Sequence, residues 1–281
     1  MIDVFPGKRT PVLLATFLVP SFLYWTSGLH KEGLIFTGIS LIVYVIYFSF
    51  KDQRLGIKRF LYLLAGLLLL LTLRNFIIII ITPAIVAWLL ANRRPKYGIA
   101  IFTAVYIFFG LLFFNARYIN PQLDFPQAVV TKQQEFMQLK GGNSSIPIKE
   151  LEPTAISFLK NTPQAINLST IRPYPSDVRH ILSLAAAIEI NLILLMFFLF
   201  LFFRTNGITS KNLVYFCIFF SASLLLTIGF SVNNLGAIVR YRSVIMPLLV
   251  IPMAARIDWP RLGKVFSNNI KNKNNVSNSV T

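Results

Sequence analysis

Residues 60–91 read FLYLLAGLLLLLTLRNFIIIIITPAIVAWLLA, and the topology of the whole chain depends on this segment. Two apolar halves meet at Arg74 and Asn75. A guanidinium at bilayer depth costs several kcal/mol unless it reaches the interface, water or a partner. Crossing roughly 30 Å of hydrocarbon takes about 20 helical residues, and each half is shorter than that. The stretch is therefore either one over-long tilted helix or a hairpin that turns at Arg74.

The basic residues of the short loops and tails separate these two alternatives. With a hairpin, 16 of them share the side of the N-terminus, and four (Lys31, Arg74, Arg240 and Arg242) lie opposite. With a single crossing, the split becomes 8 inside against 11 outside. Because short cytoplasmic loops carry an excess of Lys and Arg, the hairpin is favoured, and a re-entrant pair of half-helices gives the same sidedness. We therefore expect both termini in the cytoplasm and Arg74 at the outer interface or in an outward-facing cavity.

The composition indicates a polytopic membrane protein and not a soluble domain. The chain has 281 residues, of which 55% are hydrophobic and 13% charged, with several apolar stretches of spanning length. We expect an all-α transmembrane helical bundle of about eight spans with one extracytoplasmic loop of about sixty residues. The predicted spans are 11–29, 34–50, 60–73, 76–91, 97–116, 180–203, 212–232 and 243–257.

This pattern divides the chain into four parts. Residues 1–116 hold the N-terminal transmembrane helices, 117–179 the extracytoplasmic loop region, 180–257 the C-terminal transmembrane helices and 258–281 a cytoplasmic tail. Within the loop region we expect short helices at 125–139 and 153–159 and a turn or flexible segment at 141–145. The tail after Lys264 is rich in Asn, Ser and Lys and is predicted to be disordered.

Several function classes find no support in the sequence. The net charge of +17 comes from basic residues clustered between apolar spans, so it does not indicate nucleic-acid binding. The single cysteine, Cys217, precludes a disulfide or a Cys-rich zinc site within this chain. Glycine-rich phosphate loops, HExxH, GxSxG and EF-hand patterns are missing, so neither a metal nor a cofactor is expected. The lipid bilayer is the first expected partner.

Polar residues gather beside the predicted outer helix ends. Arginine forks match phosphate oxygens and stay charged near lipid, so this convergence fits a lipid-linked, phosphate-bearing substrate. Interfacial Arg and Lys that simply anchor helix ends among headgroups are the alternative. The residues concerned are His30, Lys31, Glu32, Arg74, Arg172, Asp177, Arg179, His180, Arg240 and Arg242.

Two carboxylates have open roles. Glu32 could act as a general base or pair with an arginine from another loop. Glu189 lies roughly 13 Å into its span, so it is protonated, paired with an arginine such as Arg74, or facing a polar cavity. Arg240 and Arg242 share a face only if their segment is extended, in which case they could clamp one diphosphate.

Three short motifs resemble a family of bacterial polytopic membrane proteins associated with exopolysaccharide or O-antigen gene clusters. They are PSFLYWTSGLHKEG at 20–33, Arg172-Pro-Tyr-Pro followed by the intramembrane Glu189, and NLGAIVRYR at 234–242 before a proline-containing last helix. The likeness covers residues 11–257. Such proteins are similar in layout to lipid-linked-sugar glycosyltransferases of the GT-C kind and to polysaccharide polymerases. GT-C enzymes usually carry acidic residues in a first outer loop, whereas this chain opens on Lys31-Glu32, as an N-terminally shortened member would.

The resemblance implies envelope polysaccharide assembly at the bacterial inner membrane, with transfer or polymerisation of glycans from a polyprenyl-diphosphate carrier on the outer face. Glu32 is then the predicted catalytic base. Other envelope-polysaccharide assembly proteins would be partners. A transporter or flippase of a lipid-linked or anionic solute, and a non-catalytic membrane scaffold, are the alternatives. The predicted substrate-binding residues are His30, Lys31, Arg74, Arg172, Glu189, Arg240 and Arg242.

Overall fold

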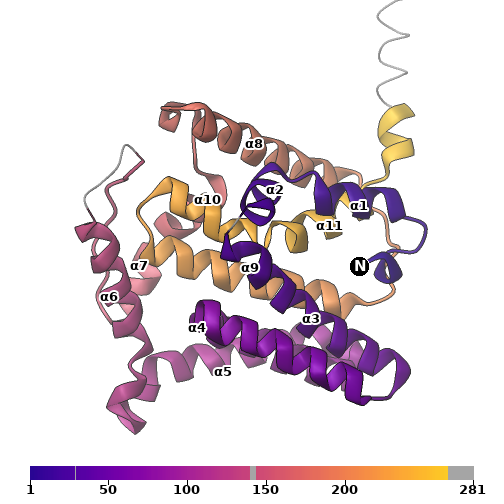
Figure 1. The fold of residues 1–281 in the computed structure, drawn as a ribbon, viewed down its shortest axis with the longest axis horizontal. Coiled ribbons are helices and arrows are strands. Elements are labelled where there is room, and N and C mark those ends of the chain that lie inside the picture. Colours follow the sequence, from indigo (N-terminus) through magenta and orange to yellow (C-terminus); the bar gives the residue numbers. More distant parts are fainter. Residues whose placement is uncertain (29, 140–143, 265–281) are drawn as a thin grey trace, which may run out of the picture.

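The computed structural model describes residues 1–28, 30–139 and 144–264, and these form an all-helical structure without a β-strand (Figure 1). This confirms the predicted all-α class. The α-helices are α1 (Arg9–Phe17), α2 (Pro20–Ser27), α3 (Lys31–Asp52), α4 (Ile57–Arg93), α5 (Gly98–Ile119), α6 (Phe125–Gln138), α7 (Ala155–Ile166), α8 (Ile181–Phe202), α9 (Lys211–Ser231), α10 (Leu235–Ser243) and α11 (Met246–Arg256).

Several helices are long and apolar enough to span a membrane. Within the described residues, α3, α4, α5, α8 and α9 each qualify, and the bent pairs α1 with α2 and α10 with α11 bring the number to seven. The bends are 59° and 63°. The first follows from Pro20, which drives Val19 out of the helical region. The predicted span over 11–29 thus corresponds to a bent pair of helices, and the final bent pair begins at Leu235, earlier than the predicted residue 243.

Helix α4 is interrupted at Arg74, whose φ of −157° and ψ of 82° are not helical. A straight helix of its 37 residues would be about 55 Å long. Instead, Arg59 near its start donates to the carbonyl of Phe48, and the Asn212 amide donates to Asn92 near its end. The residue after Asn212 lines the same cavity as Phe48. Both ends of α4 thus lie at one end of the molecule, so the chain doubles back at Arg74.

The segment between α5 and α8 is a folded layer across one end of the bundle (Figure 1). Helices α6 and α7 stack there on α9, and a Cβ at Gly229 would come within 2.1 Å of the Ala165 carbonyl oxygen. The predicted short helix at 125–139 is confirmed. The second helix, α7, extends well beyond 153–159. Residues 140–143 and the tail after Lys264 lie outside the described residues.

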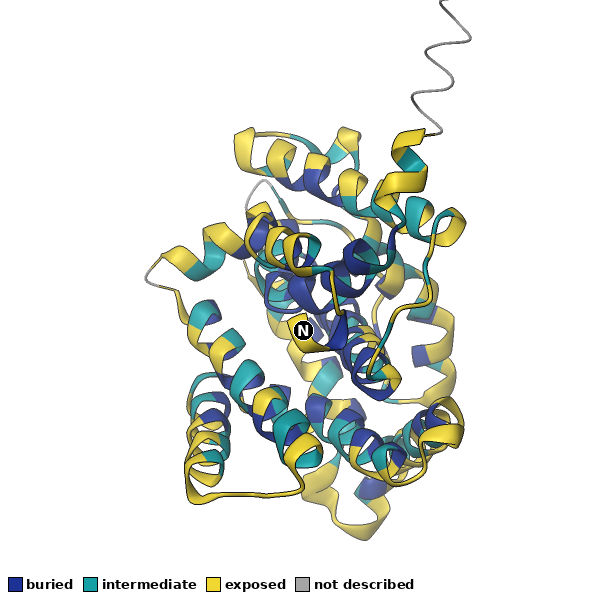
Figure 2. Ribbon diagram, turned by 90° about the vertical axis from the view of Figure 1, so that its right-hand side faces the viewer, coloured by how far each residue is buried: buried dark blue, intermediate teal, exposed yellow. Residues whose placement is uncertain are grey.

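Buried and exposed residues divide between central and peripheral helices (Figure 2). Helix α9 is the most buried of the five long apolar helices. Helices α5 and α8 expose apolar side chains on their outer faces, among them Ile99, Phe108, Leu192 and Phe198. Exposed apolar surface of this extent is typical of contact with a membrane. The predicted contact with lipid is thus supported by the exposed apolar side chains as well as by the amino-acid composition.

Candidate anion-binding site

Three residues far apart in the sequence form a buried ionic cluster. Arg240 donates through Nε to Oε1 of Glu32 at 2.6 Å and through Nη2 to Oε2 at 3.0 Å. Arg74 donates through Nη2 to Oε1 at 2.9 Å. The Glu32 side chain is fully buried, and that of Arg74 is 8% exposed. Of the two roles open to Glu32, the structure has the ion pair with arginines from other segments.

The local backbone explains why these charges are tolerated. Glu32 lies in the first turn of α3, where the positive end of the helix dipole favours a carboxylate. Arg240 lies in the last turn of α10, where a cation is favoured. Arg74 occupies the break in α4, and the Lys31 ammonium donates to the Leu73 carbonyl there at 3.5 Å. The turn in α4 is what delivers Arg74 to Glu32.

Aromatic rings cover both arginines. The Arg74 guanidinium lies 3.9 Å from the centroid of the Tyr241 ring, and that of Arg240 lies 5.2 Å from the Trp25 ring. Guanidinium groups are attracted to such ring faces, most strongly where water is excluded. The rings and the carboxylate together hold the two arginines in fixed orientations, which is what preorganised recognition of a ligand requires.

The arginines open onto a cavity of about 660 Å³ between α4, α6, α9 and α10. Lys31, Arg74, Lys132 and Arg240 bring four cations to its lining. Within the described part of the chain, two carboxylates form ion pairs with these cations. Glu32 pairs with Arg74 and Arg240, and Glu135 lies 2.6 Å from the Lys132 ammonium. The rest of the lining is mainly apolar and aromatic and includes Phe76, Ile79, Phe113, Phe125, Phe136 and Tyr241. A cation surplus beside an apolar wall fits an anionic group attached to a lipid.

Glu189 belongs to a different cavity, of about 370 Å³, between α2, α8 and α10. Its carboxylate accepts from the backbone N–H of Ser21 at 2.5 Å and from the Ser21 hydroxyl at 2.7 Å. The side chain is 96% buried and lines the cavity together with Trp25 and His180. Of the alternatives open to Glu189, the structure has a carboxylate that lines a cavity and accepts from Ser21, and among the described residues it forms no ion pair with Arg74, which binds Glu32.

Arg172 and Arg242 do not line the cationic cavity. The backbone at Arg172 is extended, as predicted. The Arg172 Nε lies 3.7 Å from an Asp177 carboxylate oxygen. Arg242 is fully buried and donates to the carbonyls of Ser169 at 3.2 Å and Arg172 at 2.7 Å. Because α10 is helical, Arg240 and Arg242 point to different sides. The expectation of an extended clamp made by this pair is therefore not met.

Of the neighbouring residues His30 and Lys31, only Lys31 lines the cationic cavity. The centroid of the His30 ring is 5.0 Å from that of Trp25, and the Arg240 guanidinium lies over the same Trp25 ring. His180, also expected near the site, instead accepts at Nδ1 from the backbone N–H of Ser183 and caps α8.

Sequence reasoning missed three contributors. Lys132 lies in the polar loop region, where a single charged residue seldom indicates a site. The available signal was that Lys132 lies on the same predicted helix as Phe125 and Phe136, which line the cavity with it. Tyr241 sits between the two arginines singled out from the sequence, and this was the available signal. Ser21, which fixes Glu189, carried none because lone serines in apolar runs are common. Within the described residues, no group of three or more His, Cys, Asp or Glu could hold a metal ion.

No protein-family model, characterised protein or solved structure matches this chain.

Proposed function

We propose that this chain is a bacterial inner-membrane protein that binds the diphosphate of a polyprenyl-linked glycan at the cationic cavity and transfers or polymerises that glycan in envelope polysaccharide assembly. The observation that carries the proposal is the surplus of cations from Lys31, Arg74, Lys132 and Arg240 beside an apolar wall. Diphosphate oxygens suit arginine forks, and a lipid tail suits the wall.

The proposed membrane arrangement counts the two arms of α4 as separate crossings, which gives eight. The short segments on the side of the N-terminus then carry most of the basic residues, as expected for cytoplasmic loops. The cavity lies at the other end of the bundle, beside α6, and so faces outward in this arrangement. A substrate presented on the outer leaflet would reach it without crossing the membrane.

In the proposed reaction an acceptor hydroxyl attacks the anomeric carbon, the bond from that carbon to the diphosphate oxygen breaks, and the hydroxyl proton passes to the departing diphosphate. The cations stabilise the charge that builds on the leaving diphosphate. Glu32 does not line the cavity and accepts three hydrogen bonds from guanidiniums, so its position suits orienting the arginines better than taking a proton. Its role as a base has no support from this geometry.

A transport function is the second candidate, and the buried, cavity-lining Glu189 is the observation that favours it. A carboxylate inside a membrane protein is a common element of ion-coupled pathways. This candidate predicts solute movement that depends on an ion gradient and is lost in Glu189→Gln. Binding of a lipid diphosphate without such movement would favour the first candidate.

The experiment is binding of a polyprenyl diphosphate to the purified protein in phosphatidylcholine nanodiscs. One charge-assisted hydrogen bond contributes roughly 1.5–3 kcal/mol, so Arg240→Gln should weaken binding by about tenfold or more. Lys132→Gln, whose ammonium is exposed, should weaken binding with little risk to the fold. Arg59→Gln, an arginine paired at the opposite end, is the control. Unchanged affinity in both cavity variants would reject the proposal.

A further inference from the structure

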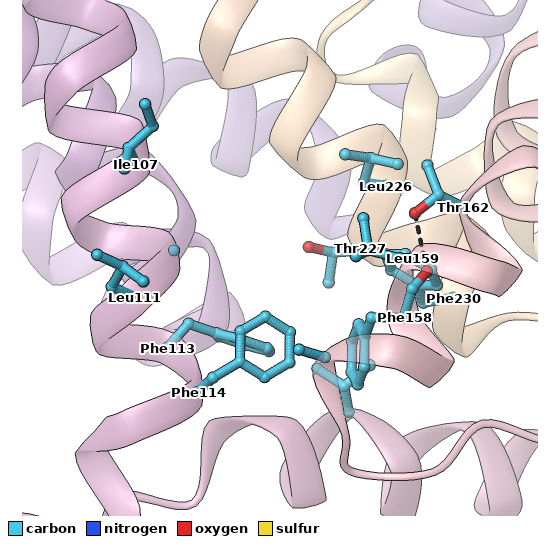
Figure 3. Close-up of a pocket in the computed structure, with 13 residues that line it drawn as sticks. Ile107, Leu111, Phe113, Phe114, Phe158, Leu159, Thr162, Leu226, Thr227 and Phe230 are labelled. Atoms are coloured by element: carbon cyan, nitrogen blue, oxygen red, sulfur yellow. Dashed lines mark hydrogen bonds between the residues drawn. The ribbon is translucent and has the colours of Figure 1, made fainter.

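A second, apolar cavity adjoins the cationic one. It measures about 440 Å³ and lies between α5, α6, α7 and α9. Ile107 and Leu111 of α5 form one wall, and Thr162 of α7 with Leu226 and Phe230 of α9 face them (Figure 3). Its volume falls in the usual range for sites that hold small molecules. Its lining consists almost entirely of aliphatic and aromatic side chains, so a polar ligand would gain nothing from entering it.

The two cavities share part of their lining. Phe113, Val129 and Thr227 line both the apolar and the cationic cavity. A ligand with an anionic head and a hydrocarbon tail can therefore place the head among the cations and continue along these three side chains. The shared lining makes the two cavities direct neighbours, and the inference of a joint site for head and tail starts from this adjacency.

The apolar cavity also opens at an exposed apolar surface. Leu111 and Leu159 at its edge are 62% and 73% exposed. These side chains lie on surfaces of α5 and α7 that are apolar on their outer side. The remainder of a long chain can thus pass from the cavity into lipid, where no further protein contact is needed.

We infer that the apolar cavity holds the isoprene units next to the diphosphate of the polyprenyl carrier. This inference rests on the proposed function, because the occupant is the tail of the molecule whose head group binds the cations. Rings of Phe113, Phe114 and Phe158 pack edge to face around the cavity, with centroids 4.9–5.6 Å apart. Burial of each methylene among such side chains adds roughly 0.8 kcal/mol, or about fourfold in affinity.

Gly110 offers a way to fill this cavity without disturbing the fold. It lines the apolar cavity, and a Cβ built on it meets no heavy atom within 4 Å. A series of Gly110→Ala, Gly110→Leu and Gly110→Phe therefore takes up increasing space. Ala104→Phe adds the same ring on the same helix at an exposed position outside the cavity and is the matched control.

The test compares farnesyl diphosphate with inorganic pyrophosphate as ligands of the full chain in phosphatidylcholine nanodiscs. The wild type should prefer the farnesyl compound. Gly110→Phe should reduce this preference at least tenfold and leave pyrophosphate affinity unchanged, Gly110→Ala should change it least, and Ala104→Phe should not change it. This pattern supports the inference.

Three other outcomes overturn it. An undiminished preference in Gly110→Phe rejects the tail site but leaves the proposed function intact. Displacement of the farnesyl probe by phosphatidylglycerol as effectively as by unlabelled farnesyl diphosphate would identify an ordinary phospholipid as the occupant. If neither diphosphate binds, or if Arg240→Gln and Lys132→Gln bind both as the wild type does, the proposed function fails first and the inference with it.

Discussion

The two ends of the molecule hold their charges in different ways. At the end nearest the N-terminus, Lys51 and Asp3 pair at 2.8 Å with side chains 52% and 42% exposed. At the other end, Glu32 is fully buried between Arg74 and Arg240. Exposed pairs contribute about 0–1 kcal/mol, whereas removing one partner from a buried group costs several times more. Because burying charges costs free energy, the ionic cluster of Glu32, Arg74 and Arg240 beside a cavity indicates a functional role more strongly than exposed ion pairs at loops do.

The largest effect is expected from removing the central carboxylate. Glu32→Ala leaves two arginines without their counterion and should lower the free energy of unfolding by roughly 3–5 kcal/mol. Thermal unfolding in detergent measures this loss. Asp52→Ala, which removes an exposed partner of Arg59, should change stability by less than about 1 kcal/mol. Equal losses in the two variants would remove the distinction between the ends.

Two helical glycines differ in how closely their surroundings are packed. Gly229→Ala would push a methyl group into the Ala165 carbonyl and should cost about 1–3 kcal/mol by separating α7 from α9. Gly110→Ala meets open space and should stabilise by about 0.5–1 kcal/mol, because alanine favours a helix. Unfolding midpoints of both variants give the result. The contact between α7 and α9 would be called into question by a neutral Gly229→Ala.

Cation–π contacts give a smaller difference. Tyr241→Leu removes the ring 3.9 Å from Arg74 and should destabilise by roughly 0.5–2 kcal/mol. Tyr118→Leu removes a 74% exposed ring near Arg117 and should have little effect. The same unfolding assay compares them. Similar values for the two would show that water reaches Arg74 as freely as it reaches Arg117.

The smallest effect concerns the exposed pair. The hydrogen bond from Lys51 holds the pKa of Asp3 below its ordinary value of 3.8. A carboxyl with a lowered folded-state pKa adds stability above its unfolded pKa and loses it as the pH falls through the folded value. Asp3→Asn should thus match the wild type in strong acid and be slightly less stable at neutral pH. A difference that grew as the pH fell would contradict this assignment.

The sequence predicted much of the fold because long apolar runs require helices in a membrane. Loop charges also predicted a turn at Arg74, and the contacts of Asn92 and Arg59 agree with that turn. The break before Pro20 was missed because the apolar run continues through it. The residues on both sides of this helix boundary are apolar, so the amino-acid composition gives no sign of it.

The site was predicted only in part. Arg74, Arg240 and Lys31 do converge on one cavity, since all three lie at helix ends that meet. Arg242 instead binds carbonyls, because the helical α10 separates neighbouring side chains by about 100° per residue. Arg172, on a different segment, lies beside Asp177. Only tertiary packing decides which of several interfacial arginines turns inward, and the pattern of charges does not encode it.

The central claim is that the chain turns back at Arg74, so that Lys31, residue 75 and Lys132 share one side of the membrane. Single cysteines at positions 31, 75, 132 and 94 in a Cys217→Ser background test it with a membrane-impermeant thiol reagent on intact cells. All four positions are exposed in the structure. The account predicts labelling at 31, 75 and 132 from outside and at 94 only after lysis. Labelling of 31 and 94 from outside, with 132 reached only after lysis, would mean that residues 60–91 cross once and would contradict it.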